Sequence, residues 1–171
     1  MTITQTQAWV GSLGGPLIVV PVSALAHWKG SLEGGEDDYD RACAVSAPAG
    51  TLAIGGVTGL VLGGEPATTC YLPEHRAFLR WLAADSEAAL LAEAGRLFAD
   101  PVTLWEDCGQ WETDGPAMLM DSVTAGAELG VEYPAGGKPE QACVEIRKGR
   151  FAIRAVHTRG VGLIQLIPET G

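Results

Sequence analysis

The sequence nearly repeats itself 100 residues further along, and this repeat limits the architectures that the chain can adopt. Residues 15–30 read GPLIVVPVSALAHWKG, and residues 115–130 read GPAMLMDSVTAGAELG. At nearly the same offset, weaker similarity relates Ala42-Cys43 to Ala142-Cys143. It also relates two later apolar runs that begin with glycine, residues 50–54 and 59–62, to residues 149–153 and 162–166. A duplicated unit forms similar local structure twice. We therefore predict a single domain, 1–171, with pseudo-repeat halves at about 9–66 and 105–168.

Short apolar runs between turn residues predict that each half is mainly β-structure. Leu17 to Val20 is β-branched in character and lies between prolines, and a helical turn is expected after Pro21. An acidic or glycine-rich loop is expected next, and Gly34-Gly35 lies in it. Residues 151–156 alternate apolar and polar side chains, as half-buried antiparallel strands do. Each half is thus expected to end in two strands joined by a turn.

The segment 67–100 has no partner in the repeat and predicts an inserted β-hairpin followed by a helix. A strand over 68–72, a turn over 73–76 and a returning strand over 78–83 are expected. Asp85 or Ser86 can cap a helix over about 86–99, and Pro101 ends it. Its apolar residues fall on one face: Leu90, Leu91, Ala94, Leu97 and Phe98. The predicted fold class is α+β, a β-rich antiparallel sheet with one main amphipathic helix.

The formal net charge of −10 argues against nucleic-acid binding, because phosphates require a basic surface. Acidic side chains are densest near residues 33–40 and 106–114, and a basic protein partner would be drawn to them. Solubility alone explains such acids equally well. Trp105 and Trp111 lie among the second group, six residues apart, and would share one face of a continuous strand. That face is either an exposed hot spot or the buried side of an edge strand. The candidate partner-binding residues are Glu36, Asp37, Asp38, Asp40, Trp105, Glu106, Asp107, Trp111, Glu112 and Asp114.

No cofactor or metal motif is visible, and none is expected. The glycines of residues 55–59 precede a strand-like run, whereas phosphate-binding loops open a helix. The three histidines are isolated, and no C-x-x-C is present. Cys70 and His75 would face each other across the hairpin as nucleophile and base, but a buried cysteine that only packs is far more common. Cys43 and Cys143 occupy matching repeat positions, which predicts equivalent buried sites.

The chain shows neither a signal peptide nor an apolar run long enough to cross a bilayer. Its four cysteines are widely spaced, which indicates free thiols and not a disulfide framework. We therefore expect a cytoplasmic protein that does not associate with membranes.

Three stretches resemble the bacterial immunity protein 21 family of polymorphic toxin systems: residues 9–18 (WVGSLGGPLI), residues 38–43 (DYDRAC), and residues 64–69 (GEPATT) leading to Arg80-Trp81. The resemblance covers nearly the whole chain, to residues 162–166. It implies a cytoplasmic protein that binds a cognate toxin and blocks it, without catalysis, and it brings no catalytic or interface residues with it. The toxin would be basic if the acidic segments bind it.

Two other function classes stay open at the level of sequence. One is a small-ligand-binding protein with its cleft between the two halves, since pseudo-symmetric interfaces form natural clefts. The other is a cysteine-dependent hydrolase that uses Cys70 and His75.

Overall fold

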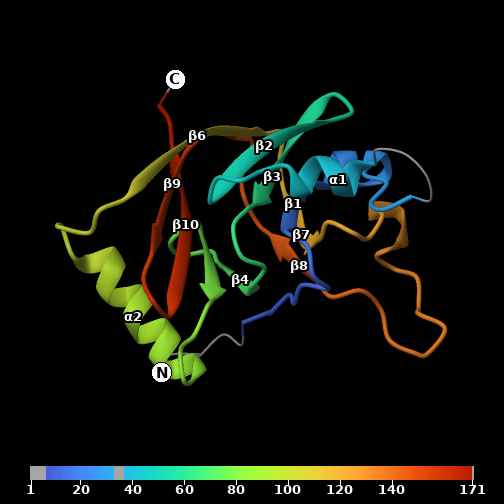
Figure 1. The fold of residues 1–171 in the computed structure, drawn as a ribbon. Helices are drawn as coiled ribbons and strands as arrows, with labels where there is room; N and C mark the ends of the chain where they lie inside the picture. The colour runs from blue at the N-terminus through green and yellow to red at the C-terminus, as the bar shows by residue number, and fades with distance from the viewer. Residues whose placement is uncertain (1–6, 33–36, 171) are drawn as a thin grey trace, which may run out of the picture.

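Ten strands form two five-stranded antiparallel sheets that pack face to face (Figure 1). A computed structural model describes residues 7–32 and 37–170 of the chain. Sheet I contains, in spatial order, β2 (Ala49–Ile54), β3 (Val57–Leu62), β1 (Leu17–Pro21), β7 (Ala117–Asp121) and β8 (Gln141–Val144). Sheet II contains β4 (Thr68–Leu72), β5 (Ala77–Trp81), β10 (Val161–Pro168), β9 (Gly149–His157) and β6 (Glu106–Thr113). The predicted β-rich, antiparallel α+β fold is confirmed.

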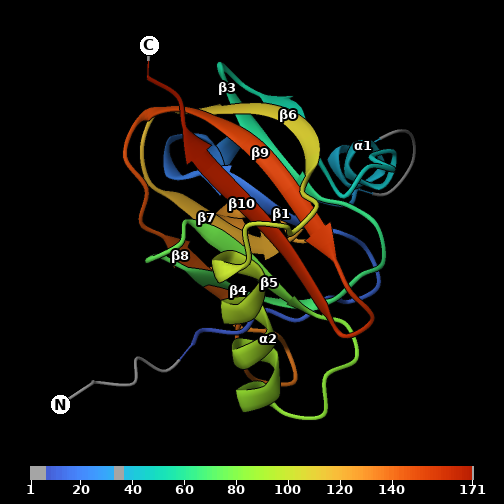
Figure 2. The ribbon, with the colours of Figure 1, turned by 90° about the vertical axis from the view of Figure 1, so that its left-hand side faces the viewer.

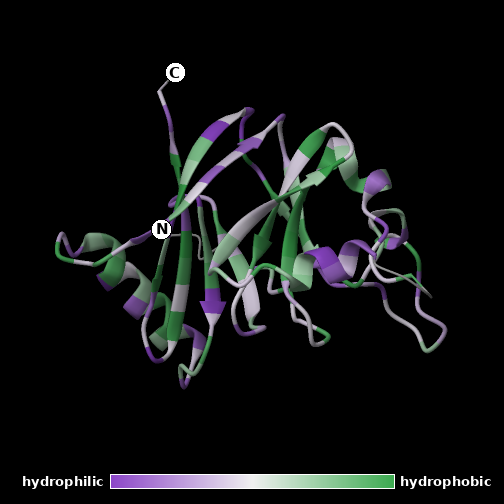
Figure 3. Cartoon of the chain, turned by 45° about the horizontal axis from the view of Figure 1, so that its top comes forward, coloured by the Kyte–Doolittle hydropathy of each residue, from purple (hydrophilic) through white to green (hydrophobic). Residues whose placement is uncertain are grey.

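The central strands are buried on both faces because other elements cover the outer side of each sheet where these strands lie. In β1, Leu17 and Val19 join the core between the sheets, whereas Ile18 and Val20 join a second core on the outer face of sheet I. In β10, Ile164 contributes to the central core, while Leu163 faces outward. This explains why β1 reads as a continuous apolar run and not as an alternating one. Figure 3 shows hydrophobic residues along the strands of both sheets.

Helix α2 (Glu87–Ala99) covers part of the outer face of sheet II, as Figures 1 and 2 show. Ser86 caps it, because its hydroxyl accepts a hydrogen bond from Ala89 N at 3.1 Å. Leu90, Ala94 and Leu97 are its buried residues. They pack with Cys70, Leu79 and Leu163 in a third core. The helix predicted at about 86–99 is confirmed.

Short helices cover the outer face of sheet I. These are the 3-10 helix η1 (Val22–His27), helix α1 (Asp38–Cys43) and the 3-10 helix η2 (Gly126–Glu128). Trp28 lies beneath them, fully buried, and its indole N–H donates to Ser122 O at 3.1 Å. The turn expected after Pro21 is therefore present as η1.

Helix α1 lies directly after Asp37, where the sequence predicts an acidic or glycine-rich loop, and corrects that prediction. Asp37 and Asp40 form a capping box, in which each side chain accepts a hydrogen bond from the other residue's backbone N–H. Asp38 accepts from Lys29 N at 2.8 Å and pairs with Arg41 at 3.0 Å. The acidic run therefore stabilises the start of a short helix. The spacing of Asp37 and Asp40 indicates this, whereas a count of charges does not.

The strands of the first repeated block, β1 and β7, pair in sheet I, but the later elements predicted to correspond lie in different sheets. Strands β2 and β3 belong to sheet I, whereas β9 and β10 belong to sheet II. The expectation for the cysteines is wrong: Cys43 ends α1, Cys143 lies in β8, and both are exposed. Duplication of the two halves stays a prediction.

Candidate partner-binding face

A β-bulge in β6 decides which way its side chains point. Asp107 pairs with Arg154 of β9, but the next partners are Gln110 and Ala152, so β6 has one residue more than β9 over this stretch. Gly109 takes up the irregularity with φ +90°, and its N–H donates to the Asp107 carboxylate at 2.8 Å. Side chains alternate between the two faces along a strand. One extra residue therefore puts the side chains that follow the bulge on the face opposite to the one they would occupy in a regular strand.

The bulge separates the two tryptophans that were expected to share a face. Trp111 is 1% exposed in the core between the sheets, and its indole N–H donates to Thr58 O at 2.8 Å. Trp105 lies on the outer side of sheet II and packs with the third core. The exposed aromatic pair is therefore a wrong prediction, and the buried-side interpretation holds for Trp111 alone.

Helix α2 leaves part of the outer face of sheet II uncovered, over β6, β9 and β10 (Figure 2). We call this part the open face. Its polar and aromatic residues are Trp105, Asp107, Gln110, Glu112, Arg150, Arg154, Gln165 and Glu169. Trp105, Asp107 and Glu112 were predicted as partner-binding residues, and the structure brings these three together.

Hydrogen bonds hold the open face in a fixed arrangement. The Arg154 guanidinium donates to Gln165 Oε1 from Nε at 2.9 Å and from an Nη atom at 2.6 Å. Gln165 in turn donates to His75 O at 3.0 Å. Nearer the end of the sheet, the Gln110 side-chain amide donates to the Glu169 carboxylate at 2.7 Å. The Arg150 guanidinium forms an ion pair with the Glu112 carboxylate at 3.3 Å.

A row of stacked rings joins the open face to α2. His75 stacks on Phe98 at a centroid distance of 4.0 Å, and Phe98 stacks on Trp105 at 6.1 Å. The Arg154 guanidinium lies over the Trp105 ring, 4.1 Å from its centroid, as a cation–π contact. Desolvation lowers the pKa of Arg154 from its ordinary value. The row fixes the end of α2 beside β9.

The remaining acidic candidates do not share this face. Glu36 lies outside the described residues. Asp37, Asp38 and Asp40 belong to the start of α1, on the far side of both sheets from the open face (Figure 1). Hydrogen bonds from the backbone N–H groups of Leu32 and Asp40 lower the pKa of Asp37. The two acidic clusters therefore offer separate surfaces.

Glu106 and Asp114 lie at the two ends of β6. Glu106 is opposite Ala155, a residue of the central core, but its own side chain is exposed at the strand's end. The Asp114 carboxylate accepts a hydrogen bond from the Ser23 hydroxyl at 2.6 Å, which ties it to η1. Neither points out from the open face.

Arg150, Arg154 and Gln165 belong to this face but were not among the partner-binding residues predicted from the sequence. The alternation of residues 151–156 was sufficient to place Arg154 opposite the core-facing side chains. The alternation does not indicate that α2 leaves this side of β9 uncovered, because that depends on how the helix packs.

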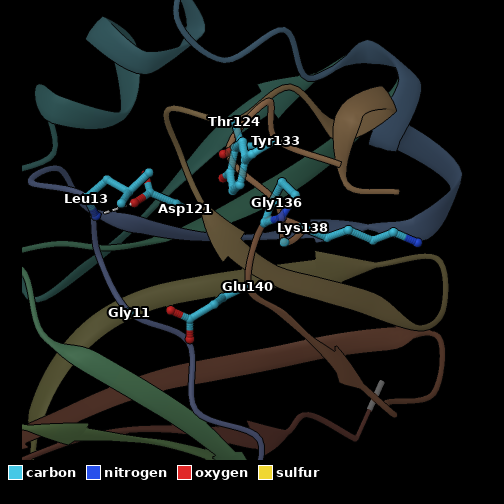
Figure 4. Close-up of a pocket in the computed structure, with 10 residues that line it drawn as sticks. Gly11, Leu13, Asp121, Thr124, Tyr133, Gly136, Lys138 and Glu140 are labelled. Carbon is cyan, nitrogen blue, oxygen red and sulfur yellow. Dashed lines mark hydrogen bonds between the residues drawn. The ribbon is translucent and has the colours of Figure 1, made fainter. Parts of the chain in front are cut away.

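A pocket of about 290 Å³ lies between residues 11–13 and the segment 121–140, at the junction of the two predicted halves (Figure 4). The Asp121 carboxylate accepts from Leu13 N at 2.6 Å and from Val123 N at 2.9 Å, so it serves the fold. Figure 4 shows Glu140 directed toward Gly11 and Lys138 extending away from the other lining residues. The volume of the pocket is close to the lower limit for small-molecule sites, and three of its ten lining residues are glycines, which offer a ligand no side chain.

Cys70 and His75, the candidate nucleophile and base of a hydrolase, do not have the environment of a catalytic pair. Cys70 is fully buried under α2, and desolvation, followed by the charges of Glu87 and Glu74, raises its pKa to about 12. The His75 ring stacks on Phe98. A thiol with this pKa does not supply a thiolate at neutral pH.

Within residues 7–32 and 37–170, no group of three His, Cys, Asp or Glu side chains is placed to hold a metal ion. In the same part of the chain, no helix combines the length and the apolar character needed to cross a bilayer.

Comparison with known families decides the relationship. The family model of immunity protein 21 matches residues 8–161 of the 171-residue chain. The chain belongs to the immunity protein 21 family. No curated protein matches it significantly, and no solved structure does.

The residues that carry the resemblance to the immunity protein 21 family support the fold. Trp9 packs against Trp81 at a centroid distance of 5.4 Å, and Val10 bridges to Thr69 beside sheet II. A few residues later, the carbonyl of Pro16 accepts a hydrogen bond from the Ser122 hydroxyl beside sheet I. This segment therefore ties the two sheets together.

Proposed function

We propose that the protein neutralises a cognate bacterial toxin in the cytoplasm by binding it directly, without catalysing a reaction. The observation that carries the proposal is the family match over residues 8–161. The buried state and raised pKa of Cys70 remove the main support for the hydrolase alternative. The small volume and glycine-rich lining of the pocket in Figure 4 likewise give little support to a small-ligand function.

The open face is the surface that we assign to the toxin. Sheet faces are rigid, and hydrogen bonds to the buried Gln165 already fix the side chain of Arg154. A partner therefore meets groups that lose little conformational entropy on binding. The partly exposed ring of Trp105, with a cation above it, is the type of anchor that dominates binding energy at interfaces.

The charge of the chain favours a basic toxin surface. A protein of net charge −10 attracts a basic partner at long range, and this attraction raises the association rate. Asp107 and Glu112 are the exposed carboxylates of β6 that belong to the open face. They are the groups that would contact basic side chains of the toxin.

The test is to purify the protein together with the toxin domain encoded beside it, and to measure the affinity at low and at physiological salt. Asp107→Asn combined with Glu112→Gln removes two charges but keeps an oxygen for the hydrogen bond from Gly109 N. We expect affinity to fall by about tenfold, which corresponds to about 1.4 kcal/mol. Glu128→Gln with Glu132→Gln removes the same charge from exposed positions outside the open face and should change little.

The outcomes separate the two parts of the proposal. Absence of any complex, together with loss of protection of toxin-producing cells, would overturn the function itself. A tight complex that is indifferent to salt and to the β6 variant would leave the function standing and reject the open face as its site.

A further inference from the structure

Four of the eleven Lys and Arg residues of this acidic chain gather in one groove. The groove has a volume of about 380 Å³ and lies where β9 begins and β10 ends, near the top of Figure 1. Arg76 comes from the β4–β5 turn, Arg147 and Lys148 from the connection between β8 and β9, and Arg150 from β9. We call it the cationic groove.

The positive charge of the groove is only partly neutralised within the chain. Arg150 is paired with Glu112 at 3.3 Å, and Arg76 Nε donates to Leu166 O at 3.3 Å. Arg147 and Lys148 are exposed, and neither forms an ion pair or a hydrogen bond with a residue that the structure describes.

The two acidic residues of the groove do not balance these cations. Glu169 is already bound by Gln110 at 2.7 Å, and Glu145 is a single exposed carboxylate. Residues 141–171 carry a net charge of +3, from five basic and two acidic side chains, whereas the whole chain carries −10. Like charges held close together repel one another, and an anionic ligand would relieve that repulsion.

The floor of the groove is apolar. Ile146 and Phe151 line it with 7% and 5% of their surfaces exposed, and both belong to the central core, so the floor is rigid. Prolines at positions 73 and 168 lie beside it. A ligand that fits this lining has carboxylates for the cations and small apolar groups for the floor, which is the chemistry of an acidic peptide segment. A nucleic acid offers phosphates, but it would also meet the net negative charge of the rest of the protein.

We propose that the cationic groove binds an acidic peptide segment of the partner protein, with Arg147 and Lys148 as the principal cations. The identity of that partner as a toxin rests on the proposed function above. Arg150 and Glu169 border both the cationic groove and the open face, so one partner can reach both. The partner would then present a basic surface to Asp107 and Glu112 and an acidic segment to the groove, an arrangement that fixes orientation as well as affinity.

A labelled peptide tests the groove without the toxin. The probe is a short fluorescein-labelled peptide of alternating glutamate and leucine. Its binding to the protein is measured by fluorescence anisotropy at low and at physiological salt. A peptide with lysine in place of glutamate and a single-stranded DNA of matched length are measured beside it. We expect binding of the acidic peptide alone, weakened by salt.

Charge reversal then locates the binding. Arg147→Glu with Lys148→Glu should weaken binding of the acidic peptide by about tenfold or more, because it reverses the sign of the groove. Arg159→Glu with Lys138→Glu makes the same change in charge at exposed positions outside the groove, and should leave binding within about twofold of the unmodified protein. All four positions are exposed, so the variants are expected to fold, and circular dichroism checks this.

Two results would overturn the proposal: equal weakening by both double variants, or binding of the DNA as tightly as the acidic peptide. Because this assay contains no toxin, it is decided separately from the proposed function. If a toxin complex forms and is also weakened by the reversal at Arg147 and Lys148, the acidic segment belongs to the toxin. If the toxin affinity is unchanged, that assignment is rejected.

Discussion

Val19 of β1 lies directly opposite Leu119 of β7, and the two residues are separated by the offset of the sequence repeat. The β1–β7 register is symmetric about this pair, because Leu17 faces Asp121 and Pro21 faces Ala117. Exchanging the two repeated segments therefore leaves their pairing unchanged. The pairing is the one that a local two-fold axis passing between Val19 and Leu119 would produce, near the centre of sheet I.

Leu119→Ala is expected to destabilise the protein by about 2–5 kcal/mol, because it leaves a cavity in the core between the sheets. Leu119 is fully buried. Urea unfolding measures the change, and Leu104→Ala is the control, since Leu104 is 89% exposed and should change stability by no more than about 0.5 kcal/mol. Similar losses at both positions would show that Leu119 is not in a closely packed core.

Gly109→Ala is expected to cost about 1–2 kcal/mol, because residue 109 has φ +90°, a conformation that side chains with a Cβ disfavour. An added Cβ meets no atom within 4 Å, so the cost is conformational and not a clash. Gly56→Ala is the matched control: it also meets open space, and its φ lies outside the positive range. Equal unfolding free energies for the two variants would contradict the geometry of the bulge.

Iodoacetamide near neutral pH is expected to label Cys43 and Cys143 first, since both are exposed. Cys108 should react more slowly, because desolvation raises its pKa. Cys70 should stay unlabelled until the protein unfolds, since it is buried and its pKa is raised to about 12. Peptide mass spectrometry over time measures the order of labelling. Early modification of Cys70 would revive the hydrolase alternative.

Stability should fall as the pH is lowered through about 6.5, partly through His157. Desolvation and the charge of Arg80 lower the pKa of His157, against a smaller opposing effect of Glu106. The unfolded chain takes up a proton near pH 6.5, before the folded one does, so stability is full above that pH and is lost as the pH falls toward the lowered folded value. His157→Gln should flatten this part of a stability-versus-pH curve obtained by urea unfolding. An unchanged slope would show that the imidazole titrates normally.

Local signals predicted most of the secondary structure. Ser86 and Pro101 were sufficient to place α2, and the turn at residues 73–76 was sufficient to place the β4–β5 hairpin. The acidic run was misread, because net charge hid the spacing of Asp37 and Asp40 that makes a capping box. In β6, the spacing of Trp105 and Trp111 assumed a regular strand, and no local rule located the extra residue near Gly109.

The sequence by itself determined the elements, because caps, turns and apolar periodicity act over a few residues. Only the tertiary structure decided which faces stay in contact with solvent. Long-range pairing put β9 beside β6 in sheet II, and α2 covered one part of that sheet and not the other. The repeat fixed the offset between Val19 and Leu119, but their contact arises from the packing of two strands that are far apart along the chain. The open face and the cationic groove are products of that packing, since each combines residues from several strands or turns.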